Sequence, residues 1–175
     1  QKWMDFSEGN YGVSLLNDCK YGHSVNEGPI GLTLIKCGVE PNPNADVEVH
    51  NFTYSLYPHA GTWKQAGTVE EAYNLNQPAY AVLGGEEGKC FSFASVDKAN
   101  VVLETIKQAE CGEGTVLRMY ECQNARTKVT LTLPEGTEKA YITNLLEEVE
   151  EELTVVDGKV TFVIKPFEVM TVLAR

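Results

Sequence analysis

The chain has 175 residues and a mass of 19.3 kDa, with 14 lysine and arginine residues against 25 aspartate and glutamate residues, so its net charge is -11 and its pI is about 4.7. A chain of this length buries a core without disulfide bonds, in one large or two small domains. Its negative field repels phosphate backbones and anionic lipids, so we expect neither nucleic acid nor a membrane surface as a partner.

The first half of the sequence predicts β-strands separated by short turns rich in glycine, proline and asparagine. Strands are expected at residues 2–6, 11–16, 30–36 and 47–57. This spacing favours an antiparallel sheet. Alternation is clearest in 47–57, where His50, Phe52, Tyr54 and Leu56 share one face, and we expect that aromatic face to be buried.

One short helix is predicted after these strands. Thr68 is placed to cap its first turn, and Glu71 follows three residues later as in a capping box. The glycine-rich stretch at 84–88 is the best candidate for a linker. We therefore expect one domain over residues 1–84 and a second over residues 85–175.

The second half predicts a compact series of strands. They are expected at residues 91–96, 101–106, 115–121, 128–133, 140–144, 152–156, 160–164 and 167–173. Val129, Leu131 and Leu133 alternate with polar residues, a pattern typical of a sheet with one solvent-exposed face. With the turns between them, these strands predict a small immunoglobulin-like β-sandwich. The glutamate-rich run at 145–152 fits either a helix or an acidic strand corner, and we favour the corner because charge protects an edge strand from pairing.

The five cysteines form no C-x-x-C pair, and their odd number leaves at least one thiol unpaired within the chain. We expect reduced thiols and a cytoplasmic location. Cys19 lies in a polar turn, but no neighbouring histidine or helix start favours its thiolate, so an inert thiol is preferred over a reactive one. The sequence lacks an apolar run of membrane-helix length and a signal peptide. Because Gln1 is not a translation start, we expect a longer polypeptide.

Residue spacing alone identifies no catalytic or metal centre. Glycoside hydrolysis requires two carboxylates that face each other, and Asp18, Asp46 and Glu48 are the loop residues considered for such a pair. The histidines His23 and His50 are too far apart in sequence for a helical metal site, although loops could bring them together. Composition and spacing therefore predict only a β-sandwich protein.

A specific resemblance adds to this reading. The run from Trp3 to Gly22, WMDFSEGNYGVSLLNDCKYG, closely resembles the C-terminal region of the α-mannosidases of glycoside hydrolase family 38, where W-x-D-L-S-E-x-x-Y-G-V-x-L-L-N-D-x-K-Y-G recurs. Phe6 replaces a leucine. Residues 41–61 resemble a second run, P-D-P-x-A-D-x-G-x-H-x-F-x-Y-x-L-x-P-H-x-G, with Asn42 and Glu48 as the departures. Shorter resemblances follow at 76–78, 117–121, 144–147 and 166–169.

The resemblance implies the end of a retaining, metal-dependent α-mannosidase. Its fold would be the second part of a large galactose-mutarotase-like β-sandwich followed by a small immunoglobulin-like β-sandwich. The nucleophile and the zinc ligands of that family belong to an N-terminal α/β domain, so this chain is expected to contain no catalytic residue and to bind no metal itself. The expected partners are that catalytic domain in the same polypeptide and the α-mannoside substrate.

The polar loops at 17–26 and 38–49 are expected to lie together at one end of the first sheet and to face the catalytic domain. The residues assigned to this cleft or interface are Asn17, Asp18, Lys20, Tyr21, His23, Asp46 and His50. Two alternatives stay open: a stand-alone carbohydrate-binding module that stacks sugars on Trp3, Trp63 and Tyr57, and an interaction scaffold without sugar contacts. Open strand edges in the first sheet also predict self-association of the chain through residues 2–57.

Overall fold

The computed structural model describes residues 1–26, 28–85 and 88–175, and the regular elements of these residues are antiparallel β-strands with one short helix, which confirms the all-β prediction. Its contacts divide the chain into two compact units, Gln1–Gly84 and Gly85–Arg175. The linker predicted at 84–88 includes Glu86 and Glu87, which lie outside the described residues. The two units are therefore taken one at a time.

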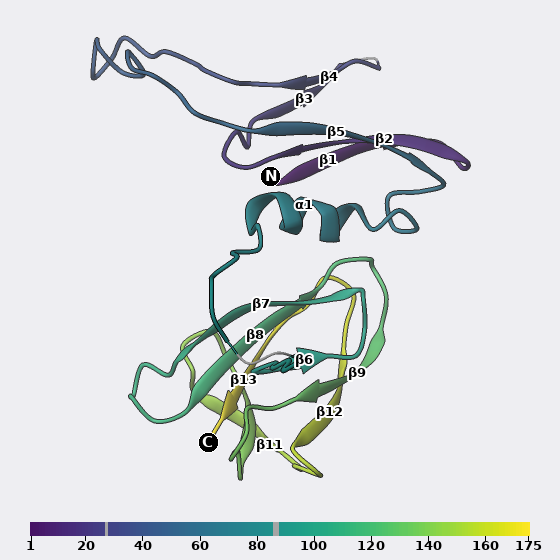
Figure 1. Cartoon of the computed structure of the whole chain (residues 1–175), viewed down its shortest axis with the longest axis vertical. Coiled ribbons are helices and arrows are strands. Elements are labelled where there is room, and N and C mark those ends of the chain that lie inside the picture. The colour runs from purple at the N-terminus through teal and green to yellow at the C-terminus, as the bar shows by residue number, and fades with distance from the viewer. Residues whose placement is uncertain (27, 86–87) are drawn as a thin grey trace. The chain divides into compact units, whose positions relative to one another are not determined.

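The first unit combines a three-stranded sheet, a small hairpin and a helix (Figure 1). Its elements are β1 (Trp3–Ser7), β2 (Tyr11–Asn17), β3 (His23–Val25), β4 (Ile30–Leu32), β5 (Tyr54–Ala60) and α1 (Thr68–Asn76). The sheet has the antiparallel order β1-β2-β5, and β3 pairs with β4. The helix is present as predicted, but the cap assigned to Thr68 is wrong. Gly67 occupies the N-cap position with φ 68°, and the Thr68 hydroxyl instead lies 2.8 Å from Ser14 Oγ on β2.

The two faces of this sheet have opposite character. Asp5, Ser14 and Tyr57 lie in one cross-strand row, and the Ser14–Thr68 contact places this row on the face that α1 covers. Figure 1 shows α1 beside this sheet. The other face carries mainly apolar side chains, among them Met4, Phe6, Val13, Leu15 and Leu56. On that face Leu56 is 66% exposed and Phe6 is 56% exposed. The face that α1 covers thus holds a buried polar row beside Trp3 and Leu16, and the opposite face is exposed at Leu56 and Phe6.

This arrangement overturns the prediction made for 47–57. Strand β5 begins only at Tyr54, because its ladder with β2 ends at the Asn17–Tyr54 pair, where the chain after β2 turns away. The prediction that the face of Tyr54 and Leu56 is buried is also wrong. Tyr54 and Leu56 are exposed, whereas the alternate residue His59 is buried under the helix side of the sheet.

The second unit is a sandwich of two antiparallel sheets. Its strands are β6 (Ser95–Val96), β7 (Val101–Gln108), β8 (Thr115–Glu121), β9 (Thr127–Thr132), β10 (Ala140–Thr143), β11 (Val149–Leu153), β12 (Lys159–Ile164) and β13 (Val169–Ala174). One sheet has the order β11-β10-β13-β8-β7 and the other the order β12-β9-β6. Strand β11 lies at a sheet edge, so the acidic corner interpretation of 145–152 is confirmed.

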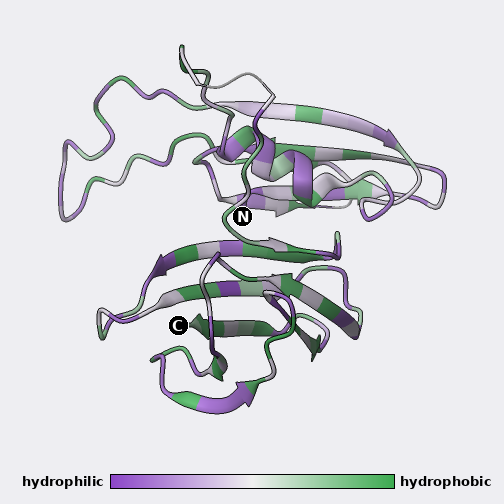
Figure 2. Ribbon diagram, turned by 60° about the horizontal axis from the view of Figure 1, so that its bottom comes forward, coloured by the Kyte–Doolittle hydropathy of each residue, from purple (hydrophilic) through white to green (hydrophobic). Residues whose placement is uncertain are grey.

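Alternation along these strands builds the core of the second unit. Figure 2 shows hydrophobic and hydrophilic bands that alternate along its strands. Val129 and Leu131 of β9 and Phe162 of β12 are buried and pack with Leu117 and Val172 of the opposite sheet. Polar neighbours such as Lys128 and Thr161 remain outside this core. In the part of the chain that the structure describes, no helix has the length and apolarity to span a membrane.

Candidate functional site

The end of β2 places Asn17 and His23 in direct contact. Asn17 is fully buried, and its Nδ2 donates to the carbonyl of Gln1 at 2.9 Å and lies 3.3 Å from His23 Nε2. His23 Nδ1 lies 3.2 Å from the carbonyl of Tyr21. These partners fit a neutral imidazole that donates from Nδ1 and accepts at Nε2. Burial lowers the pKa of His23, which favours the same neutral form.

Asp18 fastens this turn to the residue before β5. Its backbone N–H donates to the carbonyl of Thr53 at 3.1 Å, and its Oδ1 accepts the Thr53 N–H at 2.9 Å. The hydrogen bond from the Thr53 backbone lowers the pKa of Asp18 below its usual value. Asp18 therefore serves as an ionised anchor that holds two family-like runs together.

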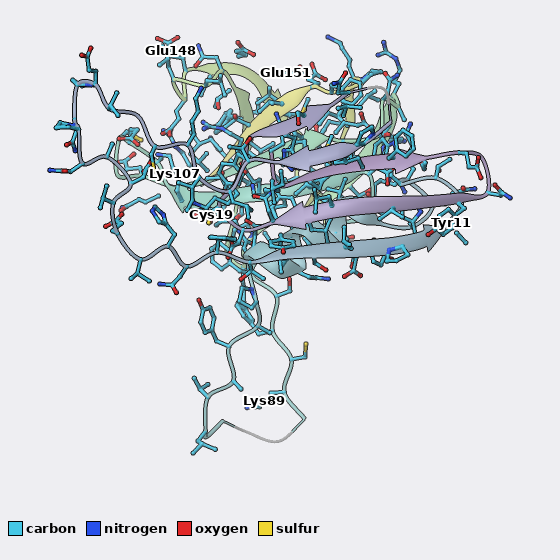
Figure 3. The ribbon with its side chains drawn as sticks, turned by 90° about the horizontal axis from the view of Figure 1, so that it is seen from above. Tyr11, Cys19, Lys89, Lys107, Glu148 and Glu151 are labelled. Carbon is cyan, nitrogen blue, oxygen red and sulfur yellow. The ribbon has the colours of Figure 1, made fainter. Side chains whose placement is uncertain are left out.

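Lys20 and Tyr21 present the accessible surface of this cluster. The Lys20 ammonium lies 5.1 Å from the centre of the Phe52 ring, within the range of a cation–π contact. The Tyr21 hydroxyl donates to the carbonyl of Asp18 at 3.1 Å, while its ring remains half exposed. Gln1, Lys2 and Tyr21 line a shallow hollow of about 230 Å³ beside the turn. A cation and a phenol are thus held in place at one end of the sheet. Figure 3 shows Cys19 at this end and Tyr11 at the other.

Asp46 and His50 form a separate part of the long segment that leads into β5. His50 Nε2 lies 2.9 Å from the carbonyl of Asp46, whose φ of 60° is in the left-handed region. Within residues 1–26, 28–85 and 88–175, no hydrogen bond or ion pair joins either residue to Asp18, Lys20 or the rest of the cluster. The structure therefore unites five of the seven predicted site residues and leaves Asp46 and His50 outside.

The chemistry available to these residues is binding and positioning. The Asp18 carboxylate already accepts the Thr53 N–H, and the Asp46 carbonyl contacts His50. Among the described residues, no group of three or more histidine, cysteine, aspartate or glutamate side chains could hold a metal ion. His23, His50 and His59 each have an internal partner instead.

A second polar cluster, which the sequence analysis missed, lies buried between the sheet and α1. Asp5 Oδ1 lies 2.8 Å from His59 Nε2 and accepts the Ser14 hydroxyl at 2.7 Å, and Oδ2 accepts the Ser7 hydroxyl at 2.6 Å. The side chains of His59 and Asp5 are 3% and 5% exposed. Burial raises the pKa of Asp5, but the hydrogen bonds from Ser7, His59 and Ser14 outweigh it, so the pKa lies below its usual value.

The sequence contained a signal for this cluster. Asp5 belongs to the first family-like run and His59 to the second, and Gly12 of the first run pairs with both Ser7 and His59 in the sheet register. A Cβ atom on Gly12 would lie 2.5 Å from His59 Cε1. Runs that share such residues can therefore encode a buried scaffold as well as a binding surface.

Comparison with known proteins places this chain in a larger context. The profile of the glycosyl hydrolases family 38 C-terminal domain matches residues 1–44, and that of the family 38 C-terminal beta sandwich domain matches residues 100–172. Human alpha-mannosidase 2C1 is 37% identical over 98% of this chain, which covers 17% of the human protein. Alpha-mannosidase G of Dictyostelium discoideum is 37% identical over 97% of this chain, which covers 16% of that protein.

Solved structures show the same fold. A protein of glycosyl hydrolase family 38 and an alpha-mannosidase, both from Enterococcus faecalis, superpose on the whole chain with TM-scores of 0.76 and 0.74 at 23% identity, and the chain covers 22% and 21% of them. The fold and the two matched profiles define a β-sandwich region of a glycosyl hydrolase. This chain belongs to family 38, and within that family it corresponds to the C-terminal region.

Proposed function

We propose that this chain is the non-catalytic C-terminal β region of a retaining α-mannosidase, where it supports the catalytic domain and shapes the cleft that receives terminal α-mannosides. The relatives that match nearly the whole chain carry the name alpha-mannosidase, and the chain spans 17% of the human protein's length. The longer polypeptide is called the parent enzyme below.

The observation that carries the supporting role is the partly exposed apolar face of the sheet β1-β2-β5, on which Leu56 and Phe6 are exposed and Leu15 is buried. Met4, Leu15 and Leu56 lie in one row across that face, and Leu56 is 66% exposed. Sheets bury an apolar face against a second layer, and exposed apolar patches mark interaction surfaces. A second layer from the parent enzyme would cover this face.

The observation that supports the cleft-shaping role is the fixed Asn17–His23 turn. Its backbone is held by Thr53 and by Gln1, so Lys20 and Tyr21 are preorganised before any ligand arrives. An ammonium and a phenol hydroxyl are suited to hydrogen-bond sugar hydroxyls or polar groups of a neighbouring domain. Preorganised polar groups lose little entropy on binding.

The nucleophile and the divalent metal, zinc in the first instance, are assigned to the catalytic domain of the parent enzyme. The histidines described here do not fit a metal centre, because Asn17 and Tyr21 engage His23, Asp46 engages His50 and Asp5 engages His59. This chain would hold the wall of the substrate cleft in place. The same proposal places the protein in the cytoplasm, supported by the exposed thiols of Cys19, Cys37, Cys90 and Cys111, which form no disulfide bond.

The stand-alone sugar-binding alternative receives less support. Trp3 and Trp63 pack on each other with ring centres 5.1 Å apart, and the Lys64 ammonium lies 5.3 Å from the Trp63 ring centre. Tyr57 uses its hydroxyl to bind the carbonyl of Ala66. The aromatic rings considered for sugar stacking therefore already serve the internal packing of the first unit.

Steady-state kinetics of the parent enzyme test this assignment. Lys20→Ala and Tyr21→Phe should each lower kcat/KM for an aryl α-mannoside by roughly tenfold, because misplacing a positioning group is costly in rate. The thermal midpoint should stay unchanged. Lys36→Ala, at an exposed position of the same unit, is the matched control and should alter neither quantity. Equal losses of activity and stability in the Lys20 and Tyr21 variants would reduce both residues to a structural role.

A further inference from the structure

His23 closes the polar turn that follows β2. The turn begins after Asn17, the last residue of β2, and ends at His23, the first residue of β3, and the two side chains meet with Asn17 Nδ2 3.3 Å from His23 Nε2. The other imidazole nitrogen, Nδ1, lies 3.2 Å from the carbonyl of Tyr21 within the turn. One imidazole ring therefore contacts both the base of the turn and its exposed part.

A backbone carbonyl sets the orientation of the Asn17 amide. Asn17 Nδ2 donates to the Gln1 carbonyl oxygen at 2.9 Å, and a carbonyl oxygen is an acceptor alone. Turning the amide over would bring Asn17 Oδ1 against that oxygen and leave two acceptors facing each other. Oδ1 is itself buried and has no hydrogen-bond partner among the described residues, so the contacts of Nδ2 hold this side chain. The amide therefore presents an N–H group to His23.

This N–H group requires a neutral His23. The Tyr21 carbonyl accepts a hydrogen from Nδ1, and the Asn17 amide donates to the lone pair at Nε2, so both nitrogens have partners only in the tautomer that is protonated at Nδ1. A second proton at Nε2 would place two donors face to face and would remove the link between Asn17 and His23. The contact with Tyr21 would remain. Protonation therefore opens the base of the turn.

The environment of His23 favours the neutral ring. Burial is the largest cause and lowers the pKa of His23, the contact with the Tyr21 carbonyl raises it, and the positive charge of the Gln1 amino group lowers it, so the pKa lies below its usual value. The Gln1 amino group donates to the same Tyr21 carbonyl at 3.1 Å. Burial acts with or without that charge, so the direction does not depend on it.

The charged groups of the neighbouring elements have other partners. The Lys2 and Lys20 ammonium groups each lie over an aromatic ring, and the Asp18 carboxylate accepts a backbone N–H. Strand β4, which pairs with β3, carries no charged residue. In the part of the chain that the structure describes, the side-chain contacts of His23 go to an amide and a carbonyl and none goes to a carboxylate. No opposing charge among these residues holds a second proton on the ring at neutral pH.

Lys20 and Tyr21 lie in the chain segment that this contact closes. The Tyr21 hydroxyl donates to the carbonyl of Asp18 at 3.1 Å, which is a contact within the same turn. The Asn17–His23 contact joins the side chains at its two ends. Opening that contact leaves the exposed part of the turn with fewer constraints on its position.

We propose that neutral His23 is a positioning residue of the parent enzyme, which holds Lys20 and Tyr21 in place through its contact with Asn17, and that protonation of its Nε2 releases the turn. This inference rests on the proposed function, because it adds a pH-dependent control to the residues that shape the cleft there. His23 acts through Asn17 and Tyr21 and is assigned no contact with the substrate.

The pH profile of the parent enzyme tests the proposal. His23→Gln keeps an acceptor that can face Asn17 Nδ2 and has no proton to take up, whereas His23→Phe keeps a ring and removes both polar contacts. At neutral pH, kcat/KM for an aryl α-mannoside should stay within roughly threefold of wild type in His23→Gln and should fall roughly tenfold in His23→Phe.

The ratio of the wild-type kcat/KM to the His23→Gln kcat/KM isolates the titration of His23, because the catalytic carboxyl groups titrate in both enzymes. This ratio should fall by at least roughly threefold between about pH 6.5 and about pH 4.5, where the wild-type ring takes up its proton. Lys36→Ala, the exposed control used above, should give a constant ratio over the same range. A constant ratio for His23→Gln, or a loss in His23→Gln as large as in His23→Phe, would overturn the positioning role.

Nitrogen NMR of the 175-residue chain tests the contact independently of activity. The His23 imidazole signals, assigned by their loss in His23→Gln, should report the tautomer protonated at Nδ1 near neutral pH. The Asn17 side-chain amide should shift on acidification with the same midpoint as the ring, and it should not titrate in His23→Gln. A tautomer protonated at Nε2, or an Asn17 amide that does not follow the titration of His23, would overturn the proposal.

The two tests separate this proposal from the proposed function. A constant kinetic ratio in a parent enzyme whose Lys20→Ala and Tyr21→Phe variants lose activity rejects the role of His23 alone. Unchanged activity in the Lys20 and Tyr21 variants rejects the proposed cleft role, and the NMR titration of His23 and Asn17 then confirms or overturns the release of the turn by itself.

Discussion

His59 Nε2 lies 2.8 Å from the Asp5 carboxylate, although the two residues are 54 positions apart and lie on the two edge strands of a three-stranded sheet. The contact spans the central strand because Gly12, which pairs with His59, has no side chain there. The network that results ties β1, β2, β5 and, through Ser14 and Thr68, helix α1. It is a buried polar connection between the sheet and the helix of the first unit.

Gly12→Ala should destabilise the first unit by about 2–3 kcal/mol, because the added methyl group would overlap His59 and Ser7 in a packed site. Urea unfolding followed by tryptophan fluorescence measures this directly, since both tryptophans, Trp3 and Trp63, lie in the first unit. Gly9→Ala is the control, because a Cβ atom there meets nothing within 4 Å. Equal stability of the two variants would contradict the packing described.

Asp5→Ala should cost about 2–4 kcal/mol, because His59, Ser14 and Ser7 would each lose a buried hydrogen-bond partner. The same fluorescence-detected unfolding measures the loss. Glu48→Ala removes an exposed carboxylate of the same unit and should change the unfolding free energy by less than about 0.5 kcal/mol. An Asp5 variant as stable as the Glu48 variant would show that the network contributes nothing.

Glu121 should make the second unit sensitive to acid. Burial raises its pKa, but hydrogen bonds from Phe167, Asn100 and Gln123 outweigh burial and hold the pKa below its usual value. A lowered pKa gives stability that is present above the unfolded-state value of about 4.3 and is lost as the pH falls through the lower folded-state value. The difference in unfolding free energy between wild type and Glu121→Gln should therefore be largest near neutral pH and should shrink below about pH 4.

Urea unfolding followed by circular dichroism at several pH values measures this dependence. Tryptophan fluorescence reports unfolding of the first unit alone and so separates it from unfolding of the second unit. Glu135→Gln is the control at an exposed turn of the second unit and should show no such trend. A difference that stays constant or grows with acidification would mean that Glu121 is not held as its hydrogen bonds indicate.

Leu56→Glu should weaken self-association of the 175-residue chain by at least roughly tenfold, because it places a charge in the open apolar face of the first sheet. Sedimentation velocity over a concentration series gives the association constant. Val163→Glu, at an exposed apolar position of the second unit, should leave association unchanged. A wild-type chain that remains monomeric at high concentration would contradict the prediction.

Local patterns in the sequence predicted much of the fold. Val129 and Leu131 alternate with polar neighbours, and the structure buries them as expected, because both sheets of the second unit contribute to one core. The prediction for 47–57 failed because alternation identifies two faces without saying which one is covered. In the first unit helix α1 covers the face of Ser14 and Tyr57 and leaves Leu56 exposed.

The sequence predicted only the part of the site that is formed by residues close together in the chain. Asn17, Asp18, Lys20, Tyr21 and His23 are neighbours in sequence, so one turn brings them together. The Asp5–His59 contact depends on a sheet register that no local pattern encodes. Asp46 and His50 were assigned by resemblance to the same cleft or interface, and the contact that the structure shows for them is with each other.

Hydrolysis of an aryl α-mannoside, measured side by side on the parent enzyme and on the 175-residue chain with added zinc or cobalt, tests the central claim most directly. The account predicts turnover by the parent enzyme and none by the chain, because a retaining mechanism needs two carboxyl groups about 5 Å apart and Asp18 is instead bound to Thr53. Turnover by the chain alone that disappears in Asp18→Ala or Asp46→Ala would contradict the account, as would a parent enzyme that does not hydrolyse the substrate.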